Sequence, residues 1–164
     1  MSGYLTQAGL ATGHILSSAE LATAIKETDF SGCAATVVGY GYMGRQYVKA
    51  LQTLGVPKIR VCSRSEQPLV ELWGTDGITT VSGGYLKLDA RPSTDELGIV
   101  ATPVGDLAAA AQHLAECGFR KVLIEKPVSL WSQGIQRLAA TLRRQGVEAA
   151  CAYNRVAYPS FHEA

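Results

Sequence analysis

Three glycines spaced G-x-G-x-x-G follow an apolar, β-branched run in this sequence. The run, Cys33–Gly39 (CAATVVG), is typical of a strand buried on both faces of a parallel sheet. Met43–Leu54 has the pattern of a helix, which Gly55 and Pro57 end. A strand, a glycine turn and a helix in this order predict the first part of a βαβ unit. The turn is then either a phosphate-binding loop or a bend without a ligand.

Apolar runs and helical segments alternate along the rest of the chain. The further strands that they predict are Lys58–Arg64, Gly77–Val81, Leu97–Thr102, Lys121–Pro127 and Val147–Asn154. The helices between them are Ser65–Gly74, which is weak, Asp106–Cys117 and Trp131–Gln145, whereas Ser82–Ser93 has no readable pattern. Strands and helices joined by short links form right-handed βαβ units, so the sequence predicts a doubly wound α/β domain of about six parallel strands.

An N-terminal segment precedes this pattern. Residues 1–16 have no clear period, and SSAE at Ser17–Glu20 is a capping-box pattern that opens a short helix to about Thr28. We therefore expect an arm and an extra helix over 1–32, the sheet domain over 33–155, and the start of a further domain over 156–164.

Size and charge limit the class of protein. A chain of 164 residues with 47% hydrophobic and 18% charged residues predicts one globular domain with a core. A net charge of +1 gives no basic field for nucleic acid, and no apolar run approaches the roughly 18 residues of a membrane span. The N-terminus lacks the pattern of a secretory signal. We expect a cytoplasmic protein without nucleic-acid or membrane partners.

The four cysteines are scattered and form no C-x-x-C pattern. They are Cys33, Cys62, Cys117 and Cys151, and three of them lie in apolar runs. This distribution predicts buried, reduced thiols in a reducing compartment, with neither a disulfide framework nor a metal site.

Each glycine of the motif has a separate role if the turn binds a dinucleotide. Gly39 permits the tight turn, Gly41 lets a pyrophosphate approach the backbone, and Gly44 lets the helix pack close to the strand. The first amides of the helix and its dipole then face the phosphates. Tyr42 and Met43 either cover the pyrophosphate or are half-exposed packing residues.

The end of the second predicted strand bears on the choice between NAD and NADP. An NAD site usually has an acidic residue there to bind the ribose hydroxyl, but this sequence reads CSRS. Arg64 offers a planar fork for a 2′-phosphate, and Ser63 and Ser65 offer hydroxyl donors. The pattern favours NADP(H) over NAD(H), unless Arg64 is an ordinary surface arginine.

Five motifs together resemble one family. VLIEKPVS is similar to the Glu-Lys-Pro signature of the Gfo/Idh/MocA family of NAD(P)-dependent oxidoreductases (glucose-fructose oxidoreductase and inositol dehydrogenase are members). The resemblance covers roughly residues 34–164. Its motifs, in order, are GYGYMG, CSRS, VATP, EKP and YNR, each at the end of a predicted strand. The resemblance implies a Rossmann fold and a nicotinamide dinucleotide cofactor.

The same resemblance implies roles for single residues. Thr102 and Pro103 match residues that line the nicotinamide end of the cofactor groove, and Glu125 matches one that contacts the nicotinamide ribose. Lys126 matches a catalytic lysine that polarises the substrate oxygen and is also counted among the cofactor-binding residues, as is Arg155. The peptide bond after Lys126, which precedes a proline, is often cis in the family.

The chain also departs from the family pattern. The family often has a histidine shortly after Thr-Pro, but here Asp106 comes first and His113 falls deep in the helix, where we expect a packing or surface role. The family's substrate domain follows the sixth strand. We therefore expect a longer parent protein, which acts on a sugar-like or other secondary alcohol, ketone or imine and forms a homo-oligomer through that domain.

Two other functions remain open at this level. A non-catalytic dinucleotide sensor or assembly module needs the glycines but gives no reason for Lys126. An S-adenosylmethionine methyltransferase also uses a glycine turn, but it normally has an acidic residue where this chain has CSRS.

Overall fold

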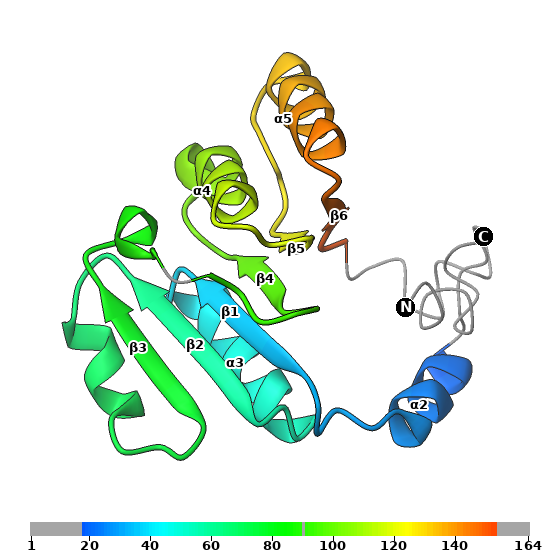
Figure 1. Ribbon diagram of the computed structural model, residues 1–164, viewed down its shortest axis with the longest axis vertical. Helices are drawn as coiled ribbons and strands as arrows, with labels where there is room; N and C mark the ends of the chain where they lie inside the picture. The colour runs from blue at the N-terminus through cyan, green and yellow to red at the C-terminus, as the bar shows by residue number, and fades with distance from the viewer. Residues whose placement is uncertain (1–17, 90, 154–164) are drawn as a thin grey trace. The chain divides into compact units, whose positions relative to one another are not determined.

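The computed structural model describes residues 18–89 and 91–153 (Figure 1). The chain divides into two units, Phe30–Ala152 and a smaller unit made of Met1–Asp29 with Tyr153–Ala164. The smaller unit contains helix α2, Ser18–Glu27, close to the expected bounds. Ser17 lies outside the described residues, so the capping box stays a prediction. In the described part of the chain, no helix has both the length and the apolar character to cross a membrane.

A six-stranded parallel sheet forms the larger unit. Its strands are β1 Ala34–Val38, β2 Lys58–Ser63, β3 Ile78–Ser82, β4 Leu97–Val100, β5 Lys121–Ile124 and β6 Glu148–Cys151. They lie in the order β3-β2-β1-β4-β5-β6, and every neighbouring pair is parallel. The chain builds outward from β1 in one direction and then crosses to β4 and builds in the other. This is the doubly wound arrangement that the sequence predicts.

Three α-helices cover the sheet. They are α3 Tyr42–Thr53, α4 Val104–Glu116 and α5 Ser132–Arg144. Helix α3 contacts β1 and β2, α4 contacts β4 and β5, and α5 packs against α4 and β6 (Figure 1). The expected weak helix after β2 is instead a 3₁₀ helix, η2 Gln67–Leu72, because a proline and a span of only six residues favour the tighter turn. A second 3₁₀ helix, η3 Tyr85–Lys87, lies in the segment that had no readable pattern.

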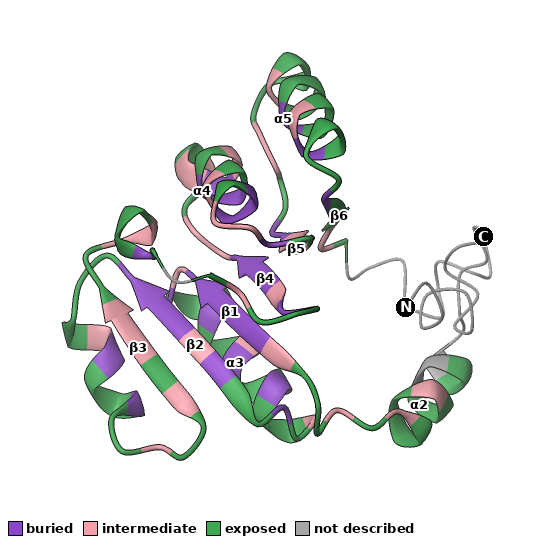
Figure 2. Ribbon diagram, in the orientation of Figure 1, coloured by how far each residue is buried: buried purple, intermediate pink, exposed green. Residues whose placement is uncertain are grey.

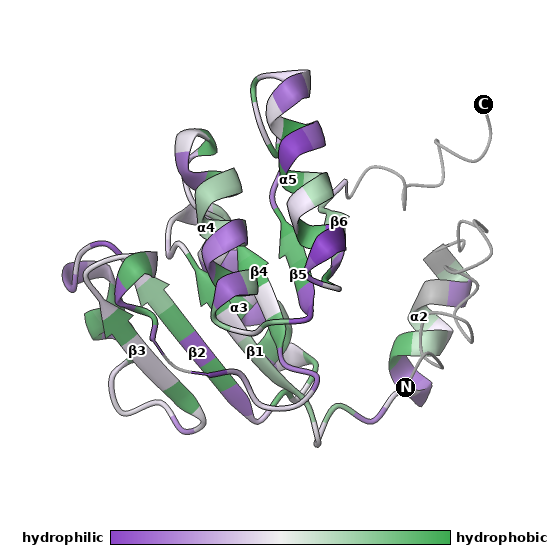
Figure 3. Cartoon of the chain, turned by 45° about the horizontal axis from the view of Figure 1, so that its top comes forward, coloured by the Kyte–Doolittle hydropathy of each residue, from purple (hydrophilic) through white to green (hydrophobic). Residues whose placement is uncertain are grey.

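The two faces of the sheet carry two hydrophobic clusters. Consecutive residues of β1 belong to different clusters: Val37 lies in the cluster that contains Val48 of α3, whereas Val38 lies in the one that contains Leu107 of α4. Strand residues alternate faces, so a strand covered on both sides must be apolar throughout. Figure 2 shows β1 buried along most of its length, and Figure 3 shows hydrophobic residues along the central strands and hydrophilic ones on the helices.

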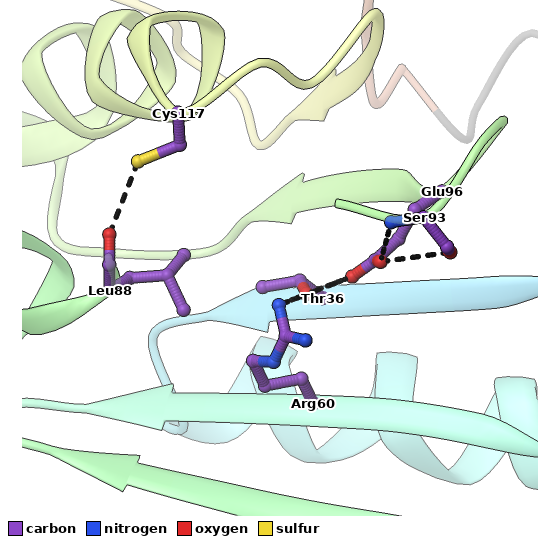
Figure 4. Close-up of polar contacts among 6 residues, drawn as sticks. All are labelled: Thr36, Arg60, Leu88, Ser93, Glu96 and Cys117. Atoms are coloured by element: carbon purple, nitrogen blue, oxygen red, sulfur yellow. Dashed lines mark hydrogen bonds and ion pairs between the residues drawn. The ribbon is translucent and has the colours of Figure 1, made fainter. Parts of the chain in front are cut away.

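A buried carboxylate joins the strands at the end of the sheet away from the glycine turn. Glu96, only 5% exposed, accepts a hydrogen bond on Oε1 from the Thr36 hydroxyl at 2.5 Å. Its Oε2 accepts from the backbone N–H and the hydroxyl of Ser93, at 2.9 and 3.1 Å, and Arg60 lies 3.6 Å from Oε1 (Figure 4). Both oxygens are therefore satisfied, as a buried charge requires.

The cysteines only partly follow the expectation. Cys62 in β2 is buried, and burial raises the pKa of its thiol to about 11. Cys33 was expected to be buried and is exposed, because it lies between a turn and β1, one residue before the strand begins. The Cys117 thiol donates to the Leu88 carbonyl at 3.1 Å (Figure 4). His113 Nε2 lies 3.1 Å from the same oxygen, which agrees with its expected packing role.

Candidate functional site

A groove of about 750 Å³ opens at the carboxyl ends of β1, β2 and β4. Open α/β sheets bind ligands at this edge, at the point where the strand order reverses, which here lies between β1 and β4. The groove brings together predicted residues from three motifs that are far apart in the chain. Those that line it are Gly39, Gly41, Tyr42, Met43, Ser63, Arg64, Ser65, Thr102 and Pro103.

Two of the motif glycines are required by the packing of the chain itself. Gly39 has a φ of +97°, and a β-carbon there would lie 2.5 Å from the carbonyl oxygen of Ala101. Its N–H donates to the carbonyl oxygen of Cys62 at 2.8 Å, which continues the pairing of β1 with β2. A β-carbon on Gly44 would overlap the carbonyl oxygen of Gly39. Gly44 is therefore buried beneath the turn and does not line the groove.

The packing of the protein does not require a glycine at the middle position of the motif, Gly41. A β-carbon on Gly41 would meet nothing within 4 Å, and its φ of −86° is open to any residue. Gly41 is the N-cap of α3, and no side chain caps the helix there. The first amides of a helix need partners. The turn therefore leaves space and amide donors for an anionic ligand such as a phosphate. Tyr42 is 78% exposed, so it is not a packing residue.

Thr102 supplies a second sign of a ligand. Its Oγ1 atom is buried, yet it has no hydrogen-bond partner among the described residues. Buried hydroxyls without a partner are rare and destabilising. Because Thr102 lines the groove at the end of β4, a bound ligand can provide the missing partner. The open space at Gly41 and this unpaired hydroxyl both fit an extended dinucleotide.

The end of β2 forms the wall of the groove on the other side of the glycine turn. Ser63 is 8% exposed, and its carbonyl accepts from Gly84 N–H at 2.9 Å, whereas Arg64 is exposed. None of the groove residues contributed by this strand end is acidic. The carboxylate in the lining is that of Asp106, in the first turn of α4.

Glu125 and Lys126 lie at the next strand end and do not line the groove. The N–H of Glu125 donates to the Val100 carbonyl at 2.9 Å, so its backbone continues the pairing of β4 with β5. Its side chain is 7% exposed, whereas Lys126 is exposed. The Lys126–Pro127 peptide bond is cis, as the resemblance implied.

Tyr47 holds the Glu125 carboxylate, a contact that the sequence did not predict. The Tyr47 hydroxyl donates to Glu125 Oε1 at 2.6 Å, and the Lys126 N–H donates to Oε2 at 3.1 Å. Burial, followed by the hydrogen bond to Glu125, raises the pKa of Tyr47 well above its usual range, so the hydroxyl remains a donor. The available sequence signal was its place on α3, three residues after Gly44.

The residue between the first two glycines is also fixed from outside the turn. Tyr40, only 7% exposed, donates its hydroxyl to Glu71 Oε1 at 2.7 Å. Arg45 pairs with the same oxygen, and its guanidinium carbon lies 4.8 Å from the centre of the Tyr40 ring. Burial and then the Glu71 carboxylate raise the pKa of Tyr40 to about 12. Arg45 is therefore held by Glu71 in a partly exposed ion pair and does not line the groove.

Some predicted residues cannot be placed. Arg155 lies outside the described residues, so its role stays a prediction. In residues 18–89 and 91–153, no group of three or more histidine, cysteine or acidic side chains is arranged to hold a metal ion.

Comparison with known proteins decides the family. Residues 34–153 match the family model described as an oxidoreductase family with an NAD-binding Rossmann fold. The chain belongs to the Gfo/Idh/MocA family. No curated protein matches it.

Solved structures agree with this family at the level of the fold. A probable dehydrogenase from Thermotoga maritima is 18% identical with a TM-score of 0.69, over 79% of this chain and 38% of that one. KijD10, a 3-ketoreductase from Actinomadura kijaniata in complex with NADP and TDP-benzene, is 20% identical with a TM-score of 0.68, over 80% and 40%. The WlbA dehydrogenase from Bordetella pertussis, in complex with NADH and UDP-GlcNAcA, is 18% identical with a TM-score of 0.68, over the same shares. This Gfo/Idh/MocA chain spans about two fifths of their length.

Proposed function

We propose that this chain is the cofactor-binding domain of an NADP(H)-dependent oxidoreductase. The observation that carries the proposal is a single groove that joins the glycine turn, the end of β2 and the unpaired hydroxyl of Thr102. Gly41 leaves open space where a pyrophosphate would approach the backbone, and the uncapped start of α3 offers amide donors to it.

The choice of NADP(H) over NAD(H) rests on the residues at the end of β2. Arg64 and Ser65 are exposed there, and Ser63 lines the same part of the groove. A guanidinium and two hydroxyls suit a 2′-phosphate, which a carboxylate at this place would repel.

The chemistry of the whole enzyme belongs to the same proposal. A bound nicotinamide supplies hydride transfer, and the exposed Lys126 at the end of β5 holds or delivers the proton of the substrate oxygen. The substrate class is a secondary alcohol, ketone or imine, and a sugar-like compound is favoured. The WlbA and KijD10 proteins, with their nucleotide-sugar and ketone chemistry, support this class.

Titration of the chain with NADPH and NADH tests the function directly. Energy transfer from Trp73 and Trp131 to the reduced nicotinamide reports binding, and calorimetry gives the affinity. We expect NADPH to bind more tightly than NADH. Equal or tighter binding of NADH would contradict the NADP(H) assignment, and no binding of either would contradict the function as a whole.

Catalysis is tested in a longer protein that includes the substrate domain. Lys126→Ala should there lower kcat far more than it weakens NADPH binding. An unchanged kcat would show that Lys126 does not handle the proton, whereas a longer protein that binds NADPH without turnover would favour the alternative, a non-catalytic dinucleotide-binding module.

We also propose that the full protein is a cytoplasmic homo-oligomer. We place the subunit contact in the substrate domain, as the family resemblance implies. Sedimentation of the longer protein that includes this domain should show self-association, and a strictly monomeric longer protein would contradict the proposal.

A further inference from the structure

The Glu125 carboxylate accepts hydrogen bonds from two directions. The Tyr47 hydroxyl binds Oε1 and the Lys126 N–H binds Oε2, at 2.6 and 3.1 Å. Within residues 18–89 and 91–153, no lysine or arginine side chain forms an ion pair with it. A carboxylate has about four acceptor positions, and these two bonds use two of them. The remaining positions can accept hydroxyl donors from a ligand.

Both parts of this contact are rigidly placed. The backbone of Glu125 pairs with Val100 in the sheet, and α3 lies against β1 so closely that Gly44 has no room for a β-carbon. Tyr47 is one helical turn beyond Gly44, and its neighbour Val48 is buried in the core. The hydroxyl of Tyr47 is therefore fixed relative to the glycine turn, and through it the carboxylate is fixed as well.

The strand order shows which part of a ligand would meet this carboxylate. From β2 to β5 the sheet runs β2-β1-β4-β5, which is three strand spacings, or about 14 Å. A dinucleotide whose adenosine end lies at the β2 end and whose pyrophosphate crosses the glycine turn brings its other half toward β4 and β5. The Glu125 carboxylate lies at that far end.

We propose that Tyr47 is a positioning residue: it orients the Glu125 carboxylate toward the hydroxyl groups of the nicotinamide half of the cofactor. The inference rests on the proposed function and adds to it a residue on the glycine-motif helix that serves the nicotinamide half of the cofactor, at the strand end beyond the lining of the groove. If Tyr47 served stability alone, its hydrogen bond would only connect α3 to the end of β5. Its loss would then not affect the binding of one half of the cofactor more than the other.

The positioning role and the purely structural role can be distinguished by comparing the affinity for the whole cofactor with the affinity for its adenosine half. Calorimetry of the purified chain with NADPH and with 2′,5′-ADP gives both affinities. Tyr47→Phe removes only the hydroxyl, and we expect it to weaken NADPH by about 3- to 10-fold, the range for one hydrogen bond, while 2′,5′-ADP changes by less than about twofold. In a Glu125→Ala background, Tyr47→Phe should have no further effect, because coupled residues are not additive.

Two further variants keep the test decisive. Thr36→Val removes a different buried hydroxyl bound to a carboxylate, at the other end of the sheet, and should lower Tm without changing the ratio of the two affinities. Glu125→Asp withdraws the carboxylate from Tyr47 and should reproduce the split between the ligands if Tyr47→Phe fails to fold.

The outcomes distinguish this inference from the function on which it rests. If Tyr47→Phe weakens both ligands equally, or if its effect persists without the Glu125 side chain, the positioning role is wrong and the proposed function stands. If the unaltered chain binds neither NADPH nor NADH, both are wrong.

Discussion

The α-carbon of Gly44 lies so close to the carbonyl oxygen of Gly39 that no β-carbon fits between them. This contact joins the first turn of α3 to the end of β1. Gly41, which lies between them in the sequence, meets nothing in the protein. The two positions thus require glycine for different reasons. Gly44 is needed for the packing of the fold, whereas Gly41 leaves room for a ligand.

The two glycines should therefore respond differently to alanine. Gly44→Ala forces backbone atoms apart, and we expect it to lower the free energy of unfolding by about 3 kcal/mol or to prevent folding. Gly41→Ala has a compatible φ and open space, so its stability should change by less than about 1 kcal/mol while its affinity for NADPH falls at least about tenfold. Urea unfolding and calorimetry measure the two quantities. A stable Gly44→Ala protein or a Gly41→Ala protein with normal affinity would contradict this assignment.

Arg64 should select the cofactor. Arg64→Ala removes the charged donor at the end of β2, and we expect it to weaken NADPH binding by about 1–3 kcal/mol, the range for a charged hydrogen bond. NADH has no 2′-phosphate, so its affinity should hardly change. Arg137→Ala, an exposed arginine on α5 away from the groove, is the matched control. If Arg64→Ala weakens NADPH and NADH alike, the 2′-phosphate is not its partner.

Tyr40 should make the fold sensitive to alkaline pH. Its pKa is raised from 10.0 to about 12, first by burial and then by Glu71, so the native state favours the protonated phenol. The stabilisation is fully present below pH 10 and is lost as the pH rises through 12. We expect the stability advantage of wild type over Tyr40→Phe to shrink by about 1–2 kcal/mol between these values, since its partner Glu71 is half-exposed and solvent weakens their interaction. Urea unfolding at a series of pH values measures it, and a constant difference would refute the assignment.

Local patterns predicted the strands, the glycine turn and their order, because each depends on residues close together in the sequence. Where the bounds differ, the cause is tertiary. The fourth strand was expected to reach Thr102 but ends at Val100, since the chain leaves the sheet there to line the groove. The contact of Tyr47 with Glu125 spans 78 residues, and no local pattern encodes it.

The same limit applies to Thr102, whose importance was known only from the family resemblance. Its unpaired hydroxyl became visible once the groove was formed, and it predicts a variant that separates stability from binding. Thr102→Val keeps the shape and removes the buried polar atom, so the free energy of unfolding of the ligand-free chain should rise by about 1 kcal/mol. Affinity for NADPH should fall by about 3- to 10-fold, because the ligand loses a hydrogen bond.

Thr36→Val is the matched control for this change. The Thr36 hydroxyl is also buried, but it donates to Glu96, so its loss leaves a carboxylate oxygen short of a partner and should destabilise the chain by about 1–3 kcal/mol. The two threonine-to-valine changes are chemically identical, so we attribute opposite signs in urea unfolding to the partner that each hydroxyl has. A destabilised Thr102→Val protein with normal NADPH affinity would mean that the hydroxyl serves the fold, and the groove would lose one of its two signs of a ligand.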